Sequence, residues 1–311
     1  MNESFIDDTI SNLKCLFFYI PIVYSVPCCA FYIFTIHVLS KKRLKKWFKS
    51  TFFTLFKIQG IADIVFHLSN WPMLRMPFSG IFNGLFELQA LQTGWFPTIT
   101  IFVSYYSMYL HIFFLVLITL NRFVVIGCST YWHLLWNKHL RFLIIFVLLL
   151  PLILTWHMIV GGGTFTYFQG EGWAIKHHNV FGIRNSLYVL VITVTASCFG
   201  LIMNVVTIAS IVINKKHRRH WAEVKLFFLT FACSVIHSLH TALQTTSYLK
   251  KDSLPFMKEI FTITPFVVDL TCFTAPWFLL MTSKTFRRAA YRVLKRNKGP
   301  IFDSAVFARR S

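Results

Sequence analysis

The sequence predicts an all-α membrane protein, a bundle of seven transmembrane helices. Apolar residues make up 56% of its 311 residues and mean hydropathy is +0.60. Charged residues account for 14%, whereas soluble domains carry about a quarter. Seven apolar runs are each long enough to cross a hydrocarbon core of roughly 30 Å at 1.5 Å per residue. The basic residues gather in alternate connections between these runs, as in a multi-pass membrane protein.

In chain order, the seven predicted helices form one membrane domain over residues 16–283. They cover approximately residues 16–39, 51–73, 97–127, 142–163, 185–213, 226–249 and 261–283. Residues 1–15 form an acidic tail before a first run that is too long for a cleaved signal peptide. Residues 284–311 form a basic tail. Within it, residues 284–298 place apolar side chains on one face, which predicts a short interfacial helix; the alternative is a solvated basic tail.

The charge asymmetry predicts the orientation. Most of the 31 Lys and Arg residues lie in the first, third and fifth connections and in the tail. Since basic residues stay on the cytoplasmic side, the N-terminus is expected outside and the C-terminus in the cytoplasm. The sequon at Asn2 would then lie outside, as glycosylation requires. The net charge of +20 therefore indicates membrane topology rather than a nucleic-acid partner.

No motif predicts an enzyme, a metal site or a cofactor. The seven cysteines include no CxxC pair and imply no disulfide framework. His237 and His240 are three residues apart, but His240 is expected off the His237 stripe, and there is no HExxH motif for a metallohydrolase. Gly161–Gly163 ends the fourth run without the Lys-Ser of a phosphate loop.

The third run, residues 97–127, is predicted to be the central helix. Thr100, Ser104, Ser107 and His111 recur at steps of three and four and so share one helix face. Arg122 lies three turns beyond His111 on that face. A polar stripe on an otherwise apolar helix is costly against lipid, so this face should point inward.

Polar stripes recur on other runs and predict a solvated cavity in the outer half of the bundle. They comprise Gln59, Asp63, His67 and Asn70 on the second run, Ser186, Thr193, Ser197, Asn204 and Thr207 on the fifth, and Thr230, Ser234, His237, Thr241, Gln244 and Tyr248 on the sixth. The candidate ligand-cavity residues are Ser104, Ser107, His111, His237 and Thr241. The alternative interpretation is that these side chains only hydrogen-bond helices together.

Asp63 and Asp269 are the two intramembrane carboxylates. Counting from the helix ends puts both about 12 Å below the outer edge of the core. An ionised carboxylate there costs roughly 2.5–3.5 kcal/mol on insertion scales, so each requires a partner. Two interpretations stay open: a polar switch site with a bound cation or shared proton, and a structural hydrogen-bond node.

Short motifs resemble those of G-protein-coupled receptors. Ile61-Ala62-Asp63 is similar to the aspartate motif of helix two, and Asn121-Arg122-Phe123 to the Asp-Arg-Tyr triplet, with Asn in place of Asp. The usual disulfide, the Cys-Trp-x-Pro motif and the Asn-Pro-x-x-Tyr motif are absent, and Thr274-Ala275-Pro276-Trp277 stands in the last place. With Tyr131, Trp132, Trp136 and Asn204, the chain most resembles the nematode serpentine chemoreceptors of class gamma and class V (Srg, Srv).

The resemblance implies a chemosensory receptor for an unknown small molecule, in the plasma or ciliary membrane of sensory neurons, that signals to a heterotrimeric G protein. Asn121 and Arg122 would form the coupling switch. Because Asn121 cannot make the ion pair that Asp would, a weaker inactive-state lock is expected. The alternative is a seven-helix transporter or ligand-gated channel. The lack of a detectable repeat argues against a transporter, and the orientation is opposite to that of insect-type odorant channels.

Overall fold

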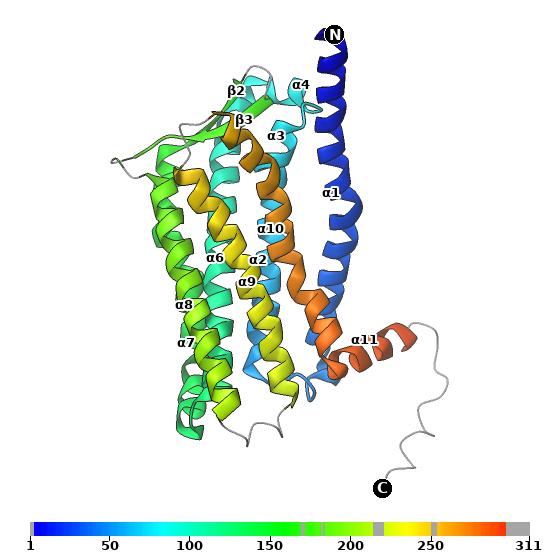
Figure 1. The fold of residues 1–311 in the computed structure, drawn as a ribbon, viewed down its shortest axis with the longest axis vertical. Coiled ribbons are helices and arrows are strands. Elements are labelled where there is room, and N and C mark those ends of the chain that lie inside the picture. The colour runs from blue at the N-terminus through cyan, green and yellow to red at the C-terminus, as the bar shows by residue number, and fades with distance from the viewer. Residues whose placement is uncertain are drawn as a thin grey trace.

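The computed structural model describes residues 3–168, 172–180, 182, 184–213, 221–249 and 254–296. Within these ranges seven helices are long and apolar enough to cross a membrane, and they lie along a common axis (Figure 1). They are α1 (Glu3–Ser40), α2 (Thr51–Asn70), α6 (Trp95–Gly127), α7 (Thr130–Gly161), α8 (Asn185–Ile213), α9 (Trp221–Leu249) and α10 (Leu254–Thr282). The predicted fold class is confirmed: the chain is a multi-pass membrane protein with a seven-helix bundle. Asn2 lies outside the described residues.

Helix α6 is the centre of the bundle. It contacts α2, α7, α8 and α9, and its buried residues extend from Pro97 to Ile126. Helices α7 and α8 bury much less of their surface and leave large apolar side chains exposed, as expected for helices that face lipid. The polar stripes point inward, and most of their residues are buried among the helices rather than exposed to solvent. Ser186 is the exception, because it is exposed at the start of α8.

Four helices differ clearly from their predicted bounds. Helix α1 begins at Glu3 rather than near residue 16, and α10 begins at Leu254 rather than near residue 261, because polar residues continue each helix beyond its apolar run. Helix α7 begins at Thr130, well before the expected start at residue 142, because an amphipathic stretch with Lys138 and Arg141 continues the helix beyond its apolar part. Beyond Asn70, α2 continues through a π-helical turn, η2 (Trp71–Arg75), into α3 (Met76–Phe78). The prolines in this stretch redirect the helix without ending it, so Arg75 stays attached to the second span.

A β-hairpin lies over one end of the bundle, which we call the hairpin end. It consists of β2 (Gly163–Phe168) and β3 (Gly172–His177), and β1 (Thr93–Gly94) pairs with β2 in antiparallel register. Phe165 and Trp173 pack on Phe86 of the short helix α4 (Asn83–Phe86), which is followed by α5 (Gln89–Gln92). The ring centroids of Phe86 and Phe165 are 4.7 Å apart. All six cysteines whose side chains are described are free, so among these residues aromatic packing holds the hairpin.

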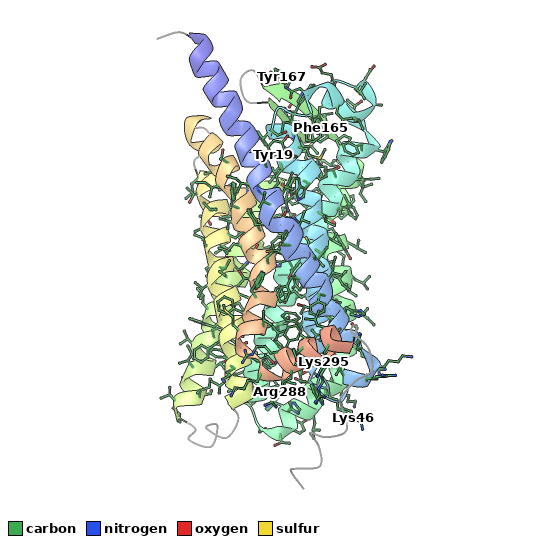
Figure 2. The ribbon with its side chains drawn as sticks, turned by 90° about the vertical axis from the view of Figure 1, so that its right-hand side faces the viewer. Tyr19, Lys46, Phe165, Tyr167, Arg288 and Lys295 are labelled. Atoms are coloured by element: carbon green, nitrogen blue, oxygen red, sulfur yellow. The ribbon has the colours of Figure 1, made fainter. Side chains whose placement is uncertain are left out.

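Helix α11 (Lys284–Arg296) lies across the opposite end, the tail end, after a sharp bend from α10 (Figure 1). Its buried face of Phe286, Ala289, Ala290 and Val293 packs on the bundle, while Leu294 is exposed. Lys46, Arg288 and Lys295 gather at this end, far from Phe165 and Tyr167 of the hairpin (Figure 2). The short helix η1 (Lys42–Leu44) joins α1 to α2 here, and the guanidinium of Arg292 lies 4.5 Å from the ring centre of Trp47.

Candidate functional site

Asp63 lies at the centre of a buried polar cluster from three helices. Its Oδ2 accepts a hydrogen bond from the Tyr32 hydroxyl of α1 at 2.6 Å, and its Oδ1 lies 2.6 Å from Nδ1 of His111 on α6. All three residues are at most 3% exposed. No Lys or Arg side chain is recorded against this carboxylate among the described residues. The distribution of charge between Asp63 and His111 therefore depends on which of the two groups holds the proton that they share.

Gly60 makes this cluster possible. A Cβ at this position would stand 2.7 Å from Cε2 of Tyr32, closer than real Cβ atoms approach a neighbour. The missing side chain lets α1 approach α2 closely enough for the Tyr32 hydroxyl to reach Asp63 one turn along α2. Small residues at helix contacts commonly serve this purpose in membranes.

Histidines extend the cluster toward α9. The ring centroids of His111 and His237 are 6.1 Å apart, and those of His237 and His240 are also 6.1 Å apart. His240 is 1% exposed, so this histidine is also enclosed by the bundle. Its position three residues from His237 still lies on the inward side, because helices on both sides bury α9. Within the described part of the chain, no three His, Cys, Asp or Glu side chains are grouped to hold a metal ion.

Two small voids in the bundle have a volume of about 10 Å³ each, room for roughly one water molecule, and one of them borders this histidine row. His237, Ser197 and Ser234 line one of them together with Thr119 of α6. The hydroxyls of Ser197 and Thr241 are 2.7 Å apart and join α8 to α9. Thr241 therefore belongs to an interhelical hydrogen bond, and of the candidate ligand-cavity residues it is His237 that borders a void.

Ser104 and Ser107 link α6 to α2 nearer the hairpin end. Ser104 donates to the carbonyl of Ser69 at 3.1 Å, and the hydroxyls of Ser69 and Ser107 are 3.5 Å apart. These serines are buried and do not meet His111 and His237 in one pocket. The five candidate cavity residues thus divide into an α2–α6 contact, the Asp63 cluster and an α8–α9 contact.

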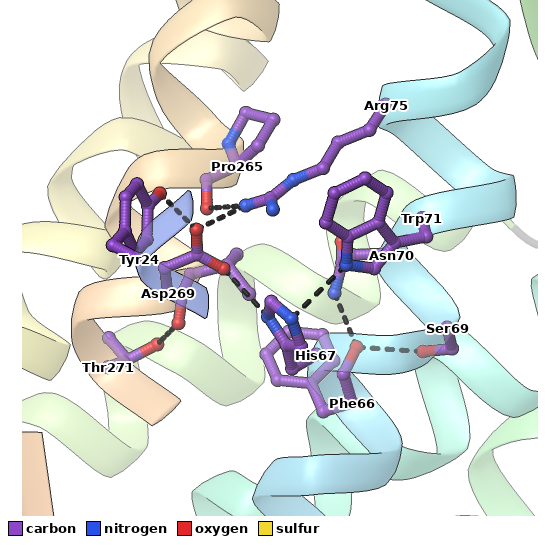
Figure 3. Close-up of polar contacts among 11 residues, drawn as sticks. Tyr24, Phe66, His67, Ser69, Asn70, Trp71, Arg75, Pro265, Asp269 and Thr271 are labelled. Carbon is purple, nitrogen blue, oxygen red and sulfur yellow. Dashed lines mark hydrogen bonds and ion pairs between the residues drawn. The ribbon is translucent and has the colours of Figure 1, made fainter. Parts of the chain in front are cut away.

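Asp269 forms a second cluster (Figure 3). It lies against His67, which is one helical turn after Asp63 on α2 and so closer to the hairpin end. Its Oδ2 accepts hydrogen bonds from the Tyr24 hydroxyl of α1 and from Nη2 of Arg75, and its Oδ1 lies 2.8 Å from Nδ1 of His67. Nη2 of Arg75 also donates to the carbonyl of Pro265 at 3.0 Å. The cluster therefore connects α1, α2 with its π-helical turn, and α10.

The tautomer of His67 follows from its second partner. The indole Nε1–H of Trp71 points at Nε2 of His67 at 3.1 Å, and indole can only donate. Nε2 must accept, so Nδ1 carries the proton and donates to Asp269. His67 is therefore neutral in this arrangement. The charges that remain are the Asp269 carboxylate and the Arg75 guanidinium, which balance each other.

Sequence reasoning missed four members of these clusters: Tyr24, Tyr32, Trp71 and Arg75. Tyr24 and Tyr32 are eight residues apart on α1 and so lie on one face, but they stand in a segment rich in Phe and Tyr. The predicted second helix ends at residue 73, which leaves Arg75 in the connection after it. The signal that could have identified Arg75 is its position one helical turn beyond Trp71 in a run that remains apolar.

Asn121 and Arg122 lie at the tail end of α6. Arg122 is fully buried, and its guanidinium carbon lies 4.0 Å from the ring centre of Phe52. Asn121 accepts a hydrogen bond from the Thr51 hydroxyl at 2.6 Å, at the start of α2. An arginine that only anchors the helix at the lipid surface would extend into the interface, whereas this one is enclosed by protein.

The arrangement of helices has a known counterpart. Squid rhodopsin superposes with a TM-score of 0.67 at 13% identity, over 94% of this chain and 89% of that one. The molecule is therefore a seven-helix membrane protein with the rhodopsin fold.

The sequence places it more closely. The description of the Srg family chemoreceptors matches residues 18–290, and the chain belongs to this family. Serpentine receptor class gamma-69 of Caenorhabditis elegans is 22% identical over 88% of this chain and 81% of its own length. Serpentine receptors class gamma-15 and gamma-4 of the same organism are each 24% identical, over 70% and 75% of this chain and 68% and 75% of their own lengths. The resemblance to class gamma receptors is confirmed.

Proposed function

We propose that the protein is a G-protein-coupled chemosensory receptor that binds a small molecule in the half of the bundle nearer the hairpin end and signals to a heterotrimeric G protein at the tail end. The burial of Arg122 at the tail end of the central helix carries this proposal. In a bundle with the rhodopsin fold, an enclosed arginine at this place can change partners when the helices around it move. Membership of the Srg family supports the receptor class.

In the proposed orientation the hairpin end faces outside and the tail end faces the cytoplasm. The basic residues that gather at the tail end support this orientation, since cytoplasmic ends of membrane helices carry more Lys and Arg. The membrane would be the plasma or ciliary membrane of a sensory neuron, as expected for a chemoreceptor. Epitope tags at the two termini, each stained before and after permeabilisation, test the orientation. Termini in the same compartment would contradict it.

A ligand can shift the balance between two helix arrangements only by binding one of them more tightly. The Asp63 and Asp269 clusters connect α1, α2, α6 and α10 in the half where the ligand would bind. Contacts broken or made there would alter the relative positions of α2 and α6. The same two helices meet at Asn121, Thr51 and Arg122, which gives the binding half a physical connection to the proposed coupling end.

The test is a cell-based signalling assay with co-expressed G proteins and a panel of odorants. Arg122→Gln is expected to abolish ligand-dependent signal at unchanged surface expression. Arg141→Gln is the control, because Arg141 is exposed on α7. Equal loss in both variants, or a retained signal in Arg122→Gln, would contradict the proposed role. A ligand-dependent current that needs no G protein would instead indicate a transporter or channel.

A further inference from the structure

The Arg75 guanidinium has hydrogen-bonding capacity that the protein does not use. Arginine carries five N–H donors, and both donors of Nη2 are engaged by Asp269 and Pro265. Nε and Nη1 are buried and have no hydrogen-bond partner among the described residues, and the side chain as a whole is 4% exposed. Buried donors on a charged group are costly to leave unpaired. An acceptor from outside the described residues can satisfy these two donors.

The geometry of guanidinium specifies the kind of acceptor. Its two forks, Nε with Nη2 and Nη1 with Nη2, each match the two oxygens of a carboxylate, and each contains Nη2. A carboxylate that binds either fork must share Nη2 with the groups already there. Those groups are Asp269 and the Pro265 carbonyl, both on α10. Asp269 carries the same charge as an incoming carboxylate, so it is the group with which that carboxylate would compete for the guanidinium.

The surroundings indicate the rest of the ligand. The guanidinium carbon lies 4.9 Å from the ring centre of Trp71, and the ring of Phe18 lies 5.4 Å from that of Trp71. Phe82 continues the aromatic wall at 5.4 Å from Phe18. Arg75 is the one cation recorded in this cluster among the described residues, and Asp269 already balances its charge. An incoming acid would therefore have to replace Asp269 as the counter-ion, which a monoanion can do one for one.

We propose that Arg75 anchors a small organic acid with an apolar body, whose carboxylate competes with Asp269 for the guanidinium. Such acids would be the ligand class of the proposed receptor. The binding of the acid does not depend on the proposed function; only its biological role rests on that function. Binding of the acid loosens the link between Arg75 and α10, which gives it a direct effect on helix position.

Octanoate is the probe, and octanamide, of equal chain length and no charge, is its control. The full-length receptor is purified in neutral detergent without anionic lipid, and its thermal unfolding is followed as each compound is added. Octanoate is expected to raise Tm in a saturable manner and octanamide is not. A Tm that neither compound raises, or that both raise equally, overturns the proposal.

Variants then assign the effect to the guanidinium. Arg75→Gln is expected to weaken octanoate binding about ten- to a hundredfold, the usual effect of losing a charged hydrogen bond. Arg184→Gln, at an exposed arginine before α8, should leave it unchanged. Asp269→Asn removes the competitor and should tighten octanoate binding, a change opposite in sign to that of Arg75→Gln. If Arg75 were purely structural, the two variants would not change octanoate affinity in opposite directions.

Should Arg75→Gln fail to fold, Asp269→Asn decides alone: tighter octanoate binding supports the competition, and unchanged or weaker binding overturns it. These binding measurements require no G protein. Signalling without octanoate binding would therefore overturn this inference alone, and octanoate binding without signalling would contradict the proposed function alone.

Discussion

The two intramembrane carboxylates have nearly the same partners and different electrostatics. Asp63 and Asp269 each receive a hydroxyl hydrogen bond from a tyrosine of α1 and each lies against a histidine. Asp269 also has a guanidinium, which fixes a positive charge beside it. Asp63 has no such cation among the described residues, and its charge depends on the proton it shares with His111. Arg75 thus makes the Asp269 site differ from the Asp63 site. The Asp269 site, nearer the hairpin end, is a charge-balanced contact, whereas the charge on Asp63 depends on a shared proton.

The difference also concerns how each site tolerates change. Around Asp269 every recorded partner is a donor, since Tyr24 and Arg75 donate and His67 is held as an Nδ1 donor by Trp71. Around Asp63 the histidine has an unpaired Nε2, so either of its ring nitrogens can carry the proton. The first site accepts one charge distribution, and the second accepts two. The Asp63 site, which accepts two charge distributions, is the better candidate for a switch between helix arrangements. The Asp269 site, which accepts one, is the better candidate for a contact that holds a single arrangement.

The largest expected effect is that of Asp269→Asn compared with Asp63→Asn. An amide at 269 would set its NH₂ against a donor in either orientation and leave the buried Arg75 guanidinium without a counter-charge, which costs about 3–5 kcal/mol. An amide at 63 can accept from Tyr32 and donate to His111 after the histidine changes tautomer, so the loss is about 1–2 kcal/mol. Thermal unfolding in detergent measures both. Equal losses would mean that the two clusters do not differ as described.

The next effect concerns the approach of α1 to α2. Gly60→Ala should push Tyr32 away from Asp63 and destabilise the protein by about 1–3 kcal/mol, the usual range for overpacking. Gly84→Ala is the matched control, because nothing lies within 4 Å of a Cβ built there. Adding Tyr32→Phe to Gly60→Ala should cost less than Tyr32→Phe alone, since the hydroxyl contact is already lost. An additive loss would show that Gly60 does not act through the Tyr32–Asp63 hydrogen bond.

Sequence reasoning located the helices more reliably than the contacts between them, and the reason is physical. A membrane-spanning helix can be recognised in the sequence from its long apolar run. Its inward face can be recognised from polar residues at steps of three and four. Which residues meet depends on how each helix is rotated and how closely it approaches its neighbours. Gly60 sets one such approach, and its effect on Tyr32 is visible only when α1 and α2 are placed together. Arg75 was missed because the second span continues through a π-helical turn beyond residue 73, where it was predicted to end.

The smallest expected effect extends the comparison to the tail end, where Asn121→Asp would place a carboxylate beside Arg122. Asn121 uses Oδ1 to accept from Thr51, and its Nδ2 is buried without a hydrogen-bond partner. An aspartate would keep the Thr51 contact and replace the unpaired Nδ2 with an acceptor next to a buried guanidinium. The tail end would then resemble the Asp269 site, with one fixed charge distribution that favours the inactive arrangement. A coupling of about 1 kcal/mol would lower basal signal roughly fivefold.

Basal reporter activity at equal surface expression measures this effect of Asn121→Asp. The control is Asn137→Asp, which adds the same charge away from Arg122, at an exposed position on α7. Unchanged or higher basal activity in Asn121→Asp would show that Arg122 does not respond to a neighbouring carboxylate as Arg75 does. The Arg122 site and the Arg75 site would then resemble each other only in the residue types that they contain.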